Sequence, residues 1–61
     1  MISEDAVLRH AWQMLRASGT DAQQEATDYA RSLAEKGDEA GSELWQRVAT
    51  AIGRLQQPNA K

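Results

Sequence analysis

The sequence predicts an all-α fold: a compact three-helix bundle with very short connections. Three observations carry this prediction. Apolar residues recur at helical spacing in three successive segments, and a glycine follows each of the first two. No segment alternates apolar and polar residues as a half-buried strand does. We expect helices over about residues 4–18, 21–36 and 39–57, within a single domain that spans residues 1–61.

The first helix has clear signals at both ends. Ser3 suits the N-cap position, where its hydroxyl can accept a hydrogen bond from a free backbone N–H. Ile2 and Val7 have the spacing of a hydrophobic staple around that cap. Gly19 should end the helix with a positive φ. The residues that share its inward arc are Val7, Leu8, Ala11, Met14, Leu15 and Ser18, with Trp12 at the edge.

The second helix is unusual because its inward residues are nearly all small. Thr20 and Gln23 have the spacing of a capping box, and Gly37 should end the helix after Lys36. The inward residues are Ala22, Ala26, Tyr29, Ala30 and Leu33. Small side chains allow helix axes to approach closely, so we expect this helix to pack tightly against a neighbour.

The third helix should begin at an Asp38 cap and end before Pro58, which leaves residues 58–61 as a frayed tail. Its inward residues are Gly41, Leu44, Trp45, Val48, Ala51, Ile52 and Leu55. A glycine inside a helix costs about 1 kcal/mol relative to alanine. Gly41 therefore predicts that another helix backbone, such as that of the first helix, passes too close for a Cβ.

Short connections make consecutive helices spatial neighbours, which fits either an up-down-up bundle or an arrangement with one splayed corner. The core available to either is thin, because 11 of the 25 apolar residues are alanine. The chain has no cysteine for a disulfide or a zinc site. A small core without such cross-links predicts self-association or a partner surface.

Charge and composition argue against several functions. The net charge of −2 and the pI near 5.2 disfavour nucleic-acid binding. The acidic start and apolar runs of at most three residues lead us to expect neither a signal peptide nor a membrane span, hence a cytoplasmic protein. His10 has Ala6 and Met14 one turn away rather than a carboxylate, so we expect it on the surface. We expect no catalytic, cofactor-binding or metal site, and no enzymatic activity.

Trp45 is expected in the core, whereas Trp12 could either complete the core or anchor another chain. The candidate interface comprises Val7, Leu8, Trp12 and Leu15.

The leading hypothesis is a non-catalytic helical adaptor or regulator that binds a protein partner or pairs as a homodimer. The alternative is a small helix-turn-helix-like DNA-binding regulator that uses Arg47 and Arg54. Glu43 on the same face and a short second turn count against it.

One pattern supports a comparison with a known group: Gly19, Ala22, Ala26, Ala30, Gly37-Asp38, Gly41, Trp45, Val48, Ala51-Ile52 and Leu55. It resembles a group of small proteobacterial helical proteins of unknown function, with an alanine-rich middle helix and a Gly-Asp turn before a tryptophan-bearing last helix. The likeness covers about residues 11–55. It implies a short, free-standing cytoplasmic protein and assigns no active-site residue.

Overall fold

The computed structural model describes residues 3–56, and every regular element in that range is helical. The elements are α1 (Glu4–Ser18), a 3₁₀ turn η1 (Gly19–Asp21), α2 (Ala22–Glu35) and α3 (Glu39–Gln56). The prediction of an all-α fold is confirmed for these residues. The predicted division into three separate helices is not, because η1 joins α1 to α2 without a break. The described chain is one long bent helical segment followed by α3.

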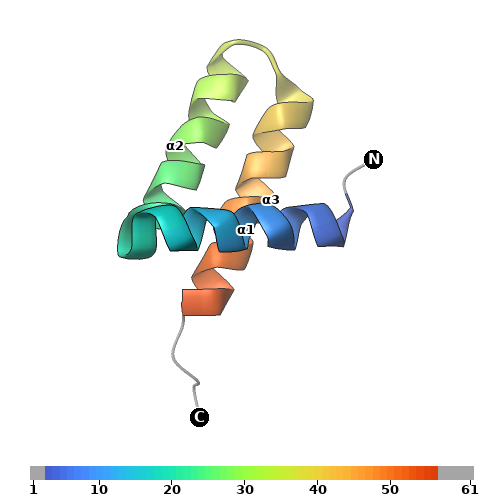
Figure 1. The fold of residues 1–61 in the computed structure, drawn as a ribbon. Helices are drawn as coiled ribbons and strands as arrows, with labels where there is room; N and C mark the ends of the chain where they lie inside the picture. The colour runs from blue at the N-terminus through green and yellow to red at the C-terminus, as the bar shows by residue number, and fades with distance from the viewer. Residues whose placement is uncertain (1–2, 57–61) are drawn as a thin grey trace.

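The arrangement in space differs from an up-down-up bundle. Figure 1 shows α2 and α3 as an antiparallel hairpin, with α1 lying across the hairpin instead of alongside it. The splayed arrangement is therefore the one adopted. Its cause is the corner at η1, which redirects the chain between α1 and α2.

The corner forms at the expected glycine. Gly19 has a φ of 59°, and its N–H donates to the carbonyl of Leu15, which ends α1. The Gln56 side chain then donates from Nε2 to the Gly19 carbonyl over 2.9 Å. The last described residue of α3 thus lies against the corner between α1 and α2.

The predicted capping box at the start of α2 is wrong. The helix begins at Ala22, and the residue before it, Asp21, makes no side-chain capping bond. Gln23 instead points to α3, where its Nε2 donates to the carbonyl of Ala49 over 3.1 Å. Gly53 leaves room for this, since a Cβ there would lie 2.5 Å from the same Nε2 atom. Gln23 thus makes a hydrogen bond between α2 and α3 in place of the expected capping bond at the start of α2.

The other caps are confirmed. The Ala6 N–H donates to Ser3 Oγ over 3.1 Å, and the Gly41 N–H donates to Asp38 Oδ1 over 2.9 Å. Gly37 has a φ of 87°, as a residue that ends a helix often does. The predicted staple and the predicted end of the last helix involve Ile2 and residues 57–61, which lie outside the described residues.

The prediction that another helix backbone passes close to Gly41 is wrong, because the nearest atoms belong to side chains. A Cβ at this position would lie 2.7 Å from the Asp38 carboxylate and 3.1 Å from Leu33 Cδ1. The close neighbours are therefore the capping side chain and a leucine of α2, and the expected backbone of α1 is not among them.

The core lies between α1 and the hairpin. Its buried apolar residues are Val7, Ala11, Ala22, Ala26, Val48, Ala49, Ala51 and Ile52. Val48 and Ile52 are the largest side chains that are fully buried. The buried alanines of α2 confirm that this helix packs closely against its neighbours. Three residues expected on the inward faces, Leu8, Tyr29 and Leu55, are instead exposed.

Candidate functional site

The four residues of the predicted interface separate into two groups. Val7 is only 2% exposed and belongs to the core, so its inclusion in an interface is a correction. Leu15 is partly buried and packs against the same core. Leu8 and Trp12 remain, with exposed fractions of 36% and 53%. Trp12 therefore does not complete the core, which leaves the role of an anchor for another chain.

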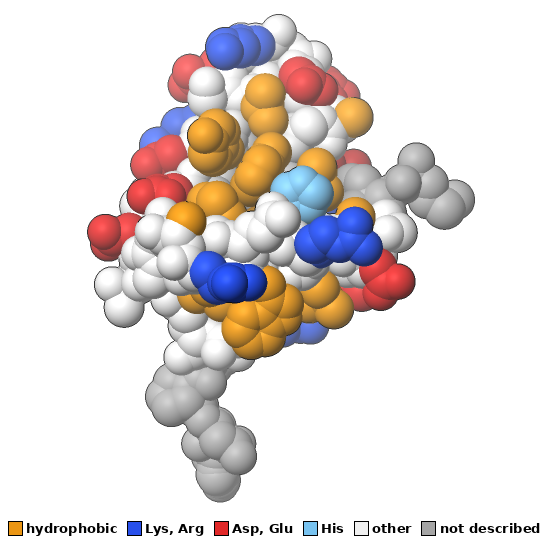
Figure 2. Space-filling model, in the orientation of Figure 1, with side chains coloured by type: hydrophobic (Ala, Val, Ile, Leu, Met, Phe, Trp, Pro, Cys, Tyr) orange, Lys and Arg blue, Asp and Glu red, His pale blue; other side chains and the backbone are white. Residues whose placement is uncertain are grey.

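An apolar surface extends from these two residues. Leu8 and Trp12 lie one turn apart on α1, so their side chains are neighbours on the helix surface. Leu55 of α3, which is 37% exposed, lines the same groove as Leu8. We call Leu8, Trp12 and Leu55 the Trp12 patch. Figure 2 shows hydrophobic side chains gathered below α1, on the side where the end of α3 emerges.

The groove beside this patch lies between α1 and α3 and has a volume of about 550 Å³. Its lining residues are Glu4, Leu8, Glu43, Gln46, Arg47, Thr50, Ala51, Arg54 and Leu55. It therefore combines an apolar side with a rim of both charges. We call it the α1/α3 groove.

One pair of charges in the groove already interacts. Arg47 donates from Nη2 to Glu43 Oε2 over 3.1 Å, and both side chains are more than half exposed. Exposed pairs of this kind contribute at most about 1 kcal/mol. Both residues thus remain available to a partner.

The structure also contains an aromatic cluster that the sequence analysis missed. Trp45 of α3 stacks on Tyr29 of α2, with ring centroids 5.0 Å apart. The Trp45 ring is also perpendicular to that of His10 of α1, with ring centroids 5.7 Å apart. His10 Nδ1 lies 2.7 Å from the Ala6 carbonyl, which can only accept, so Nδ1 carries the hydrogen. His10 is thus partly buried against a tryptophan, which corrects the expected surface position.

This cluster joins one residue from each of the three α-helices, although Tyr29 remains 54% exposed. In Figure 2 the histidine lies beside hydrophobic side chains that cover the hairpin above α1. The sequence signal is partial: periodicity puts Tyr29 and Trp45 on the inward faces of their helices, but it puts His10 outside the apolar arc of the first helix. The periodicity does not predict which ring packs against which. His10, Tyr29 and Trp45 come together because α1 crosses the α2–α3 hairpin.

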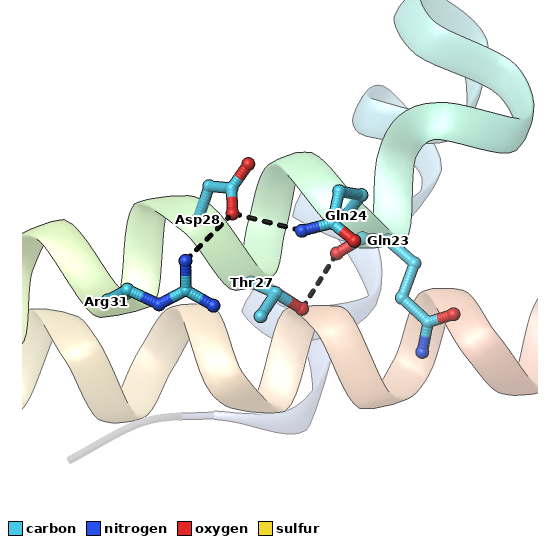
Figure 3. Close-up of polar contacts among 5 residues, drawn as sticks. All are labelled: Gln23, Gln24, Thr27, Asp28 and Arg31. Carbon is cyan, nitrogen blue, oxygen red and sulfur yellow. Dashed lines mark hydrogen bonds and ion pairs between the residues drawn. The ribbon is translucent and has the colours of Figure 1, made fainter.

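Polar side chains on α2 interact within their own helix (Figure 3). Asp28 accepts a hydrogen bond from Gln24 Nε2 over 3.0 Å and lies 3.6 Å from Arg31 Nη1. Thr27 Oγ1 donates to the Gln23 carbonyl over 2.9 Å. These exposed contacts between neighbours one turn apart are typical of a solvated helix face, and we assign no site to them.

No group of three or more His, Cys, Asp or Glu side chains within residues 3–56 is arranged to hold a metal ion. None of the helices in this range is both long and apolar enough to cross a membrane.

Comparison of the chain with protein-family models, with curated proteins and with solved structures gave no match. The resemblance to the proteobacterial group therefore stays a prediction.

Proposed function

We propose that this protein is a non-catalytic helical interaction module, a small adaptor or regulator that binds another polypeptide through the Trp12 patch. The observation that supports this most strongly is the 53% exposure of Trp12 beside an exposed leucine and an open groove. Tryptophan is among the residues that most often dominate the energy of an interface.

The expected gain from covering Trp12 is substantial. A tryptophan side chain presents about 200 Å² or more, so the exposed half represents on the order of 100 Å². At roughly 25 cal/mol per Å², covering it gives a hydrophobic gain of about 2.5 kcal/mol, part of which offsets the entropy lost on association. Leu8 and Leu55 add to this area, and the charged rim of the groove supplies orientation.

We further propose that α1, α2 and α3 behave in solution as one compact three-helix unit. The aromatic cluster and the two glutamine contacts, from Gln23 to Ala49 and from Gln56 to Gly19, support this because they link the three α-helices. We also propose a cytoplasmic location, which is what the resemblance to the proteobacterial group implies.

Photo-crosslinking tests the proposed surface. We expect a photoreactive phenylalanine analogue in place of Trp12, in cells that express the protein, to form a covalent adduct with another polypeptide. The same analogue at Arg31, an exposed residue of α2, should form none. Leu8→Ser should weaken the adduct from position 12, since Leu8 belongs to the same patch. A folded protein that gives no adduct from position 12 contradicts the proposal.

The alternative function is DNA binding. Arg47, Thr50 and Arg54 do share an exposed side of α3, as that function requires. The support is weaker because Glu4 and Glu43 line the same groove. The antiparallel α2–α3 hairpin also differs from the steep crossing of a helix-turn-helix motif.

Titration of duplex DNA at low salt discriminates between the two functions. We expect no binding beyond that of the Arg47→Ala/Arg54→Ala variant, because Glu4 and Glu43 lie in the same groove and the net charge of the chain is −2, and both repel phosphate. Binding that the double substitution abolishes would favour the DNA function instead.

A further inference from the structure

The exposed side of α3 that borders the groove carries an ordered pattern of charge. Glu43, Arg47, Thr50 and Arg54 are separated by four, three and four residues, so they lie on one face of the helix. All four are exposed and line the α1/α3 groove. The acidic residue is at one end of this row, and Arg54 is at the other, three turns or about 16 Å away.

This arrangement is complementary to itself in one orientation only. In a parallel pair of α3 helices, each charge would lie beside the same charge of the second copy. In an antiparallel pair, Glu43 of each copy lies opposite Arg54 of the other, and the two-fold axis creates the ion pair twice. A shift by one turn would bring Arg47 opposite Arg54, and such like-charge contacts are unfavourable. The pattern therefore selects both direction and register.

The apolar side of the groove fits the same occupant. Ala51 and Leu55 lie along α3 next to the charged row, and Leu8 lines the groove from α1. Ala51 is buried in the core, so the apolar side chain that the α3 helix of a second copy presents beside the charged row is Leu55. The second copy thus offers an exposed leucine and charges opposite to those of the rim.

We propose that the occupant of the α1/α3 groove is a second copy of this chain, with the two α3 helices antiparallel and Glu43 of each paired with Arg54 of the other. This inference rests on the proposed function and specifies its partner. Glu43 would then lie between Arg47 of its own chain, already 3.1 Å away, and Arg54 of the second copy.

Charge reversal tests the pairing, with sedimentation equilibrium as the measurement. We expect Glu43→Arg and Arg54→Glu each to weaken self-association by about tenfold or more, because each places like charges opposite one another. An equal mixture of the two variants should form a heterodimer at least as stable as the wild-type dimer, since both ion pairs are then restored. Arg31→Glu makes the same charge change as Arg54→Glu, but on α2, and should leave association unchanged. Circular dichroism verifies that every variant is folded.

Two results would overturn the inference: a wild-type protein that stays monomeric at the highest attainable concentration, or variants that fail to associate when mixed. The experiments distinguish a failure of the self-association inference from a failure of the proposed function. An adduct from position 12 with a different polypeptide would preserve an interaction module with a foreign partner. The absence of both self-association and any adduct would remove both proposals.

Discussion

Ile52→Ala is expected to leave a large fraction of the protein unfolded near room temperature. Ile52 is fully buried among residues of all three α-helices, and replacing a buried isoleucine with alanine costs about 2–5 kcal/mol. A single core in a chain this short rarely supplies more than about 3–5 kcal/mol. The loss is therefore comparable to the whole free energy of unfolding. Urea denaturation followed by far-ultraviolet circular dichroism measures it.

Leu55→Ala is the matched control for this prediction, because it removes a similar side chain from the same helix. Leu55 is already 37% exposed, so we expect it to cost about half as much or less. Equal losses for the two substitutions would mean that Ile52 is not the central residue of the core.

Ala26→Leu should destabilise the protein although it adds apolar volume. Ala26 is completely buried in the core, where α2 approaches its neighbours closely. Overpacking of this kind costs about 1–3 kcal/mol, because neighbouring helices must shift apart. The midpoint of urea denaturation should fall accordingly.

The control for this second prediction is Ala34→Leu, on an exposed position of the same helix. Its effect should stay within about 0.5 kcal/mol, as is usual for surface substitutions. A stabilising effect of Ala26→Leu would show that α2 is less tightly packed than the structure indicates.

The sequence predicted well those contacts that form between residues close to one another along the chain. Ser3, Gly19 and Asp38 act at their helix ends as expected, because a cap depends on the chain immediately around it. Gln23 shows where local reasoning fails. Its spacing from Thr20 fits a capping box, but its amide reaches the Ala49 carbonyl on α3, and no sequence pattern weighs those two partners against each other.

The exposed residues of the candidate site follow from the crossing of α1 over the hairpin. Periodicity identifies which side of a helix is apolar, but it does not set the angle between helices. Three parallel helices would cover each apolar face along its length. Because α1 crosses the hairpin, it covers only part of it, and Leu8, Leu55 and Tyr29 are left exposed. Trp12 was identified from its position at the edge of the arc, whereas Val7 was wrongly placed in the interface.

The two tryptophans have environments different enough to serve as separate optical reporters. Trp45 is partly buried and packs against the rings of Tyr29 and His10, so its emission should respond when α1 leaves the hairpin. Trp12 faces solvent, and its emission should move to shorter wavelengths when another chain covers it. Single-tryptophan forms of the protein would thus distinguish loss of folding from occupation of the surface by following the colour of the emitted light.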